Sequence, residues 1–162
     1  MTEIQLSIDR LKEKFPASII DVRRFRGEVT VVVSKKDILQ ICQFLFSDPE
    51  LQFQFLTDLC GCDFHPETPR FEIVYLLYSM KNNARLRLKM KVGEGEPAPS
   101  VASIWKAANW LEREVYDLFG IPFANHPDMR RILLWDGYEG YPMRKDYPVE
   151  GPDFDKPFVP EV

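Results

Sequence analysis

The residue types that could carry out chemistry are concentrated between positions 112 and 148. Glu112 or Glu114 could act with Asp117 as the paired carboxylates of a general acid–base site. His126 would then carry the proton and Arg130 would bind an anion. Carboxylates beside arginines usually remain simple ions, however, and so short a chain leaves no second domain to cover a substrate. The same residues also fit a structural network of arginine–carboxylate pairs, which is the interpretation we prefer.

Spacing and composition favour this network. Arg113 and Asp117 stand four residues apart, which would let them pair on one face of a helix. From position 123 to 148, charged, aromatic and proline residues follow one another without a period, and such a stretch cannot form an ordinary core. We expect bidentate pairs to fix the helix end and to present the following segment to a partner protein. In this network Arg130 and Arg144 would neutralise buried carboxylates, which are costly to leave unpaired.

A metal site would have to come from Cys60, Cys62 and His65, which are close in sequence. Iron–sulfur clusters and structural zinc sites need a full set of ligands, whereas the chain has only 3 cysteines and 2 histidines. Cys42 falls on the apolar face of a predicted helix, and the alternative for Cys60 and Cys62 is that they are small core residues at a strand end. A nucleophile pair of Cys62 with His65 or His126 has nothing to orient the histidine. The sequence therefore favours no metal or nucleophile site.

The length and net charge of the chain argue against several classes of protein. A chain of 162 residues, of which 45% are apolar, is sufficient for one compact domain. The net charge of −4 argues against a protein that binds nucleic acid by neutralising many phosphates. The sequence contains no apolar run of the roughly 20 residues that cross a bilayer, and it does not begin with the order of a signal peptide. We expect a cytoplasmic protein that reaches a membrane only through a partner.

Hydrophobic periodicity predicts an α+β fold, a mixed, mainly antiparallel sheet packed by helices. One helix is expected over residues 2–15 with Thr2 as its N-cap, and a second helix should start from a capping box of Ser34 and Asp37. Branched and aromatic runs predict strands over residues 18–24, 28–33, 51–59, 71–80 and 84–92, the first two forming a hairpin. In the last strand apolar and basic residues alternate, which predicts a sheet with one wet face.

A long helix and an extended arm complete the predicted fold. The helix should run from a cap at Ser100 to a left-handed C-cap at Gly120, a length of roughly 30 Å, with a charged face in solvent. From Trp135 onward the chain contains 5 prolines, 3 glycines and 6 aromatic residues. This change predicts an α+β domain over residues 1–134 and an extended arm over residues 135–162. The aromatic residues favour an arm that docks on a partner over a disordered terminus.

At these positions the sequence resembles the C subunit of the proton-pumping NADH:quinone oxidoreductase, respiratory complex I. The family signature E-R-E-x-x-D-h-F-G-I-x-F-x-x-H-P-D-h-R-R-I-L, where h is apolar, matches residues 112–133. The second family block, G-H-P-L-R-K-D-Y/F-P, corresponds to residues 140–148, with Tyr141 in place of the usual histidine. The residues that carry the resemblance, and that we predict to form the partner interface, are Glu112, Arg113, Glu114, Asp117, Gly120, Phe123, His126, Pro127, Arg130, Arg131, Gly140, Pro142, Arg144, Lys145, Asp146 and Tyr147.

The resemblance implies a structural subunit whose arm wraps the quinone-reducing subunit, the D subunit of the family, on the cytoplasmic side of the membrane. It implies no catalytic residue, metal or cofactor on this chain, since FMN, the iron–sulfur clusters and quinone belong to partner subunits in the family. Two alternatives stay open. One is the equivalent subunit of a membrane-bound nickel–iron hydrogenase or related oxidoreductase. The other is a free-standing acid–base hydrolase that uses Glu114, Asp117 and His126.

Overall fold

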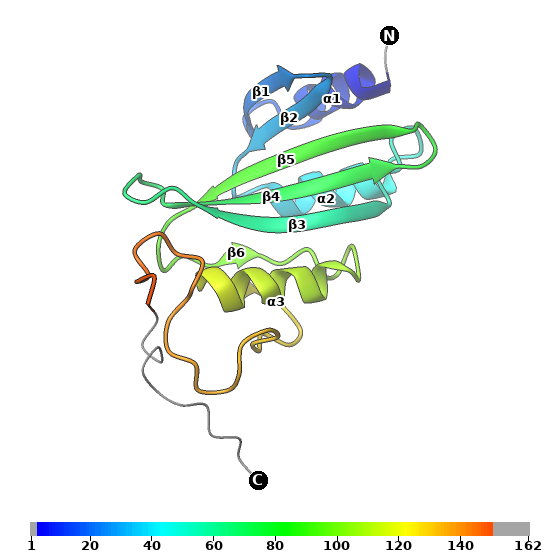
Figure 1. Cartoon of the computed structure of the whole chain (residues 1–162). Coiled ribbons are helices and arrows are strands. Elements are labelled where there is room, and N and C mark those ends of the chain that lie inside the picture. Colours follow the sequence, from blue (N-terminus) through cyan, green and yellow to red (C-terminus); the bar gives the residue numbers. More distant parts are fainter. Residues whose placement is uncertain (1–2, 151–162) are drawn as a thin grey trace.

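The computed structural model describes residues 3–150, and its centre is a five-stranded sheet (Figure 1). The strands are β1 (Ile19–Phe25), β2 (Glu28–Val33), β3 (Phe55–Asp63), β4 (Phe71–Ser79) and β5 (Ala84–Val92), in the spatial order β1-β2-β5-β4-β3. β2 and β5 are parallel, whereas the other neighbouring strands are antiparallel. The predicted α+β class with a mixed, mainly antiparallel sheet is therefore confirmed.

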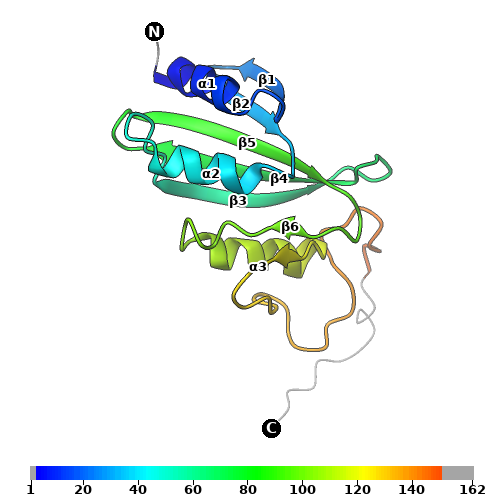
Figure 2. The same ribbon diagram turned by 180° about the vertical axis from the view of Figure 1, so that it is seen from behind.

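Helices cover one face of the sheet and flank β3. Figure 2 shows α1 (Glu3–Lys14) and α2 (Ile38–Ser47) against the back of the sheet, with α3 (Ala108–Phe119) lying beside β3. A short parallel pair, β6 (Ala98–Pro99) and β7 (Phe123–Ala124), joins the two ends of the α3 region. The largest fully buried side chains of the core include Tyr75, Phe53, Phe71, Leu11 and Ile38. Among the described residues, no helix is long and apolar enough to cross a membrane.

Two sequence patterns are reproduced closely. The hairpin of β1 and β2 turns at Arg26 and Gly27, both of which have positive φ. Every second residue of β5 is buried, with basic residues between them, so the sheet has the expected wet face. The buried residues of this alternation are Leu86, Leu88, Met90 and Val92.

The strand predicted over residues 51–59 is shifted in the structure, since β3 begins only at Phe55. Leu51 and Phe53 are fully buried, but they belong to the turn that follows α2. The Leu51 N–H donates to the Asp48 carbonyl at 3.2 Å, and the Phe53 N–H donates to the Leu45 carbonyl at 2.9 Å. Their apolar character therefore anchors a turn in the core and does not extend a strand.

The long helix predicted over residues 100–119 is wrong in its first half, because α3 begins at Ala108. Ser100 does not begin a helix, because turns follow it: its hydroxyl accepts the Ala102 N–H at 3.2 Å and donates to Glu112 at 2.6 Å. The preceding residues of β6 pair with β7, which follows α3, so the chain doubles back along the helix. Turns between them bury Trp105, whose indole N–H donates to the Phe53 carbonyl at 3.2 Å. α3 is therefore about 18 Å long at the usual rise per residue.

Two smaller expectations are corrected, and one is confirmed. The capping box at the start of α2 is absent, since the Asp37 carboxylate makes no cap bond and accepts the Ser18 hydroxyl at 2.5 Å. Cys42 is buried as predicted, and burial raises the pKa of its thiol. Cys60 is exposed and Cys62 half-buried because they lie on the wet face of β3, so they are not core residues.

Part of the predicted arm lies outside the described residues. Phe154 and Phe158 belong to residues 151–162, and the expected N-cap Thr2 also falls outside the description. The described part, residues 135–150, has no helix or strand and follows a path beneath α3 (Figure 1). The division into a domain over residues 1–134 and an arm over 135–162 stays a prediction.

Candidate functional site

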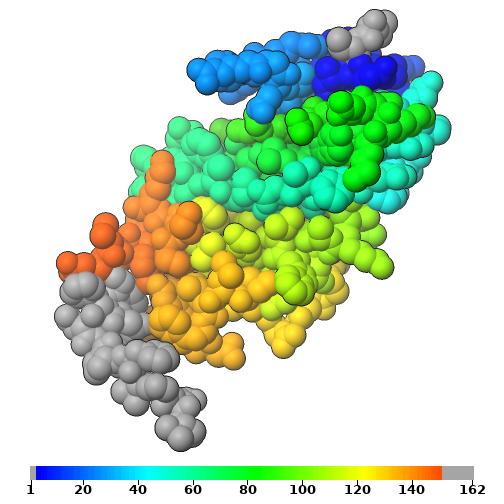
Figure 3. Space-filling model, turned by 45° about the vertical axis from the view of Figure 1, so that its right-hand side comes forward, coloured from blue at the N-terminus to red at the C-terminus, as the bar shows by residue number. Residues whose placement is uncertain are grey.

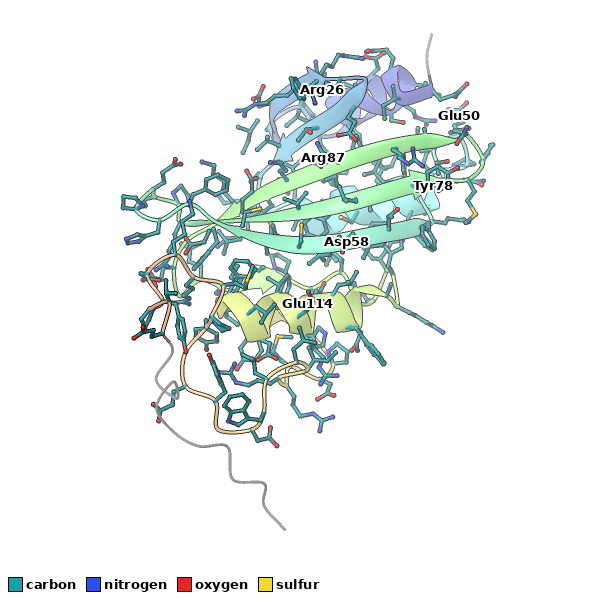
Figure 4. The ribbon with its side chains drawn as sticks, in the orientation of Figure 1. Arg26, Glu50, Asp58, Tyr78, Arg87 and Glu114 are labelled. Carbon is teal, nitrogen blue, oxygen red and sulfur yellow. The ribbon has the colours of Figure 1, made fainter. Side chains whose placement is uncertain are left out.

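The acidic side chains of α3 lie in three different environments. Glu114 points into solvent, as Figure 4 shows, and is the only one of the three that fits a solvated helix face. Glu112 and Asp117 are completely buried, with exposed fractions of 0%. The expected solvated charged face is therefore wrong for these two residues. A buried carboxylate needs partners, and the partners define what each one does.

Asp117 holds the start of the segment that leaves the domain. One carboxylate oxygen accepts Arg131 Nη1 at 2.7 Å, and the other accepts the N–H groups of residues 132, 133 and 134 at 3.0, 2.8 and 2.9 Å. Burial acts to raise the pKa of Asp117, but these hydrogen bonds outweigh it and lower the pKa below its usual value. Asp117 is therefore an ionised anchor, and both of its oxygens are occupied.

The arginine partners differ from those expected. Arg113 does not pair with Asp117, since it donates to the carbonyls of Arg130 and Arg131 at 3.0 and 2.9 Å. Arg130 forms a bidentate pair with Asp128 at 2.6 and 2.7 Å, but its side chain is 77% exposed. The expectation that Arg130 neutralises a buried carboxylate is therefore wrong, and Arg131 does so.

Glu112 joins α3 to the chain that precedes it. Its carboxylate accepts the Ser100 hydroxyl at 2.6 Å and the Val101 N–H at 2.7 Å. Burial raises the pKa of Glu112 to about 7, although the bonds from Ser100 and Val101 act in the opposite direction. Glu112 thus combines a structural position with a proton affinity far above that of Asp117.

His126 lies next to Glu112 but holds the loop after β7. Its Nδ1 accepts the Asp128 N–H at 3.0 Å, which assigns the proton to Nε2. Nε2 donates to the Asn109 carbonyl at 2.9 Å and is 3.9 Å from Glu112 Oε2. Both ring nitrogens are therefore engaged in holding the loop against the start of α3.

A second charged cluster, which we call the Arg70 clamp, was not predicted from the sequence. Arg70 is buried between β3 and β4 and forms a bidentate pair with Asp63 at 3.0 and 2.8 Å. On its other side it pairs with Asp146 at 2.5 and 3.0 Å, and it reaches Glu94 at 3.1 Å. The Lys145 N–H completes the clamp by donating to Asp63 at 2.8 Å. Residues from four separate parts of the chain meet there.

The Arg70 clamp neutralises the charge of the buried Asp63. The bonds from Arg70 lower the pKa of Asp63 well below its usual range, and the bonds to Asp63 and Asp146 raise the pKa of Arg70. One sequence signal for this pair existed, since Arg70 directly precedes the strand predicted over residues 71–80. Asp63, however, lies four residues beyond the strand predicted over residues 51–59. In the β3–β4 register Asp63 lies opposite Phe71, which brings the two side chains together.

Arg144 fastens the clamp to the end of α3. Its Nε donates to the Phe119 carbonyl at 2.7 Å, and its Nη1 pairs with Glu94 at 3.1 Å. Glu94 is half exposed, so the expectation that Arg144 neutralises a buried carboxylate is wrong. Gly120 has the predicted left-handed conformation, with φ of 72°. A Cβ there would lie 2.5 Å from the Tyr141 ring, so only glycine fits this close approach.

The remaining predicted site residues complete the path of this segment. Phe123 is buried in β7, Pro127 is exposed and Pro142 is half-buried. Gly140 has φ of 91°, and a Cβ there would lie 2.6 Å from the Tyr147 ring. The Tyr147 hydroxyl is 2.7 Å from that of Tyr138. The structure thus brings Gly140, Pro142 and Tyr147 into one folded segment over residues 128–148, which is packed on α3 and the clamp.

The residues considered for acid–base chemistry are only partly brought together, since Glu112 Oε2 lies 3.9 Å from His126 Nε2. Within the described part of the chain, no hydrogen bond or ion pair joins any two of Glu114, Asp117 and His126. Residues 3–150 contain no group of three or more His, Cys, Asp or Glu side chains placed to hold a metal ion. What the arrangement can do is fix a backbone path by ion pairs.

The fixed path presents apolar side chains to solvent. Leu133, Trp135 and Met143 are 61%, 58% and 55% exposed, although the backbone of Leu133 is tied to Asp117. The Trp135 ring packs edge-on against Tyr138, with centroids 4.7 Å apart. Large apolar side chains on a backbone held this firmly are typical of an interface with another protein.

Comparison with known proteins gives consistent matches. Residues 31–153 match the family model described as "Respiratory-chain NADH dehydrogenase, 30 Kd subunit". The chain is 51% identical over 154 residues to the C subunit of the NADH-quinone oxidoreductase of Geotalea uraniireducens, covering 94% of this chain and 93% of the relative. It is 44% identical over 143 residues to the C subunit of the same enzyme in Roseiflexus, covering 88% and 82%.

A solved structure has the same fold. The trypsin-resistant fragment of Nqo5, residues 1–134, superposes with a TM-score of 0.67 at 30% sequence identity. The match covers 78% of this chain and 99% of the fragment.

Proposed function

This chain belongs to the family of the 30 kDa subunit of respiratory-chain NADH dehydrogenase, and we propose that it is a cofactor-free structural subunit that supports the quinone-reducing subunit of that enzyme. The family makes it a subunit of NADH-quinone oxidoreductase, and therefore part of a hetero-oligomeric complex. Its proposed place is peripheral, on the cytoplasmic side of the membrane, during electron transfer from NADH to quinone.

One observation carries this proposal: residues 128–148 are fixed by buried ion pairs while Leu133, Trp135 and Met143 stay exposed. A flexible tail would lose conformational entropy on binding, whereas a segment fixed in advance loses little. Exposed apolar residues on such a segment fit a permanent partner better than a transient one. The segment continues toward residues 151–162, which would extend the same interface.

The absence of bound redox groups is also proposed from the chemistry of the site. The polar groups of the region, such as Asp117, Arg131 and Asp63, are used to hold one another and the backbone. FMN, iron–sulfur clusters and quinone would accordingly be held by other subunits. The chain would not be catalytic by itself, because the only acid on α3 that faces solvent, Glu114, has no proton-carrying partner among the described residues.

Affinity purification of the tagged chain from its native membranes tests the proposal. We expect the quinone-reducing subunit and NADH:quinone reductase activity to co-purify, and Leu133→Glu to reduce both because it places a charge in an apolar contact. Met80→Glu is the matched control, since Met80 is 70% exposed at the far β4–β5 turn. Recovery of a nickel–iron hydrogenase large subunit would favour the related complex, and turnover by the isolated chain would favour a hydrolase.

Removal of residues 149–162 tests the arm separately. This truncation leaves the Arg70 clamp intact, so the domain should keep its circular dichroism spectrum and melting temperature while it no longer retains the quinone-reducing subunit. Unchanged recovery of that partner with the truncated chain would contradict a docking role for the arm.

A further inference from the structure

A second surface with features of an interface lies on β1, at the opposite end of the molecule from residues 128–148 (Figure 1). β1 is the edge strand of the sheet, and it pairs only with β2. Among the described residues, the backbone of β1 makes no hydrogen bond outside that pair. A free edge of seven residues is long enough to accept another strand, and proteins usually protect such an edge.

Two large apolar side chains at this edge are exposed to solvent. Ile20 is 67% exposed and Phe25 is 71% exposed. Both line a groove of about 1010 Å³ that lies between the hairpin, the wet face of β4 and β5, and the loop after β3. Phe64 and Val32 line the same groove. Figure 3 shows the hairpin projecting beyond the sheet above a hollow.

Charge at this end is opposite to that of the whole chain. β1, β2, β5 and the hairpin turn carry seven arginine and lysine side chains and two carboxylates, and the groove also contains Glu67 and Glu72, of which Glu72 pairs with Lys89. Positive charge is therefore in excess here, although the chain has a net charge of −4. The two carboxylates of the hairpin strands are already paired, Asp21 with Arg23 and Glu28 with Arg87. Arg24 donates to the neutral Gln5 side chain. The excess positive charge is complementary to an acidic ligand.

We propose that the free edge of β1 and its groove bind an extended, acidic and apolar segment of a neighbouring protein, which joins the sheet as a further strand. Main-chain hydrogen bonds to β1 would supply affinity, and alternate side chains of the segment would enter the groove beside Ile20 and Phe25. Acidic residues of the segment would meet Arg24 and Arg26, which are exposed on the hairpin; Figure 4 shows Arg26 there. The protein would thus contact neighbours at both ends.

A photo-crosslinking experiment on the assembled complex tests this contact. Phe25 is replaced by p-benzoylphenylalanine, and Met80, equally exposed at the β4–β5 turn on the side of Phe55 and β3, is replaced in a control chain. We expect position 25 to crosslink to an acidic segment of another protein and position 80 not to crosslink to that segment. No crosslink at position 25, or a crosslink only to lipid or nucleic acid, would overturn the proposal.

Hydrogen exchange separates strand addition from simple proximity. The β1 amides in the purified complex should exchange about tenfold or more slowly than in the isolated chain, because a new strand would protect the free edge. Unchanged exchange of these amides would overturn the proposal even if a crosslink formed.

Charge reversal tests the acidic character of the segment. Arg24→Glu with Arg26→Glu should lower the crosslink yield from position 25 by about fivefold or more, and the control Lys36→Glu with Lys106→Glu should not. All four residues are exposed, so unchanged circular dichroism spectra are expected and verify the fold. A yield that the Arg24 and Arg26 changes leave intact would overturn the assigned charge of the partner.

Discussion

Glu112 and Asp117 are both fully buried on α3, yet their surroundings shift their pKa values in opposite directions. Asp117 receives a guanidinium and three backbone N–H groups, which stabilise the charged form. Glu112 receives one hydroxyl and one N–H but no guanidinium, so its desolvation is only partly offset. Which of the two carboxylates is the ionised anchor therefore depends on the number and charge of its hydrogen-bond donors and not on its depth of burial.

The raised pKa of Glu112 predicts a pH-dependent stability. The folded chain holds this proton up to about pH 7, whereas an unshifted glutamate has a pKa of 4.5. Because the folded state binds the proton more tightly, the free energy of unfolding should fall as pH rises from 4.5 through about 7, by at most about 3 kcal/mol. Glu112→Gln should remove this slope in urea unfolding, and Glu114→Gln on the same helix should retain it. A slope that persists in Glu112→Gln would assign it to other groups.

The two neighbouring arginines should differ sharply in their effect on stability. Arg131→Ala leaves the buried Asp117 carboxylate without its cation, which is expected to cost about 3 kcal/mol of unfolding free energy. Arg130→Ala removes only an exposed pair with Asp128 and should leave the free energy of unfolding nearly unchanged. Chemical denaturation of both variants at neutral pH makes the comparison, and equal losses would refute the assignment of Arg131 to the buried acid.

At the scale of elements, the sequence predicts what is set locally. The hairpin, β5 and the C-cap at Gly120 follow from turn residues and periodicity, which act over a few positions. The start of α3 was misplaced because Ser100 is bound by a residue twelve positions ahead, and a local pattern cannot show that contact. The Arg70 clamp escaped prediction for the same reason, since Asp146 is 76 positions from Arg70. The sequence shows which residues belong to the motif, but it does not show which residues they bond, because those partners are distant in the sequence.

The junction between α3 and residues 141–144 depends on Gly120. Gly120→Ala places a Cβ at positive φ and within 2.7 Å of both Tyr141 and Arg144. We expect a loss of about 2–3 kcal/mol, of which about 1 kcal/mol comes from the backbone conformation. Gly137→Ala isolates that backbone contribution, since its φ is also positive but nothing lies within 4 Å of its Cβ. Equal thermal shifts for the two variants would show that the close approach of Tyr141 contributes nothing.

At the scale of the whole molecule, polar contacts tie the last part of the chain to elements far from it in sequence. Asp117 holds residues 132–134, and the Arg70 clamp holds residues 145 and 146 at the end of β3. Between the two anchors, the chain exposes Trp135 and Met143. The domain therefore sets the path by which the chain leaves it, as the proposed docking of residues 135–162 requires.

Asp146, which holds the segment at the Arg70 clamp, should contribute little to the stability of the domain. Asp146 is about half exposed, so Asp146→Asn removes its charge from the clamp while Asp63 keeps Arg70 neutralised in the interior. The unfolding midpoint should move little, because partly exposed ion pairs contribute about 1 kcal/mol or less. Trypsin, in contrast, should cleave after Arg144 and Lys145 about tenfold faster, because local opening of the segment becomes easier. Asp136→Asn is the matched control, since Asp136 is exposed in the same segment but outside the clamp. If both variants are cleaved at the wild-type rate, the path of residues 140–147 is held by the contacts of Tyr138 and Arg144 and not by the charge of Asp146.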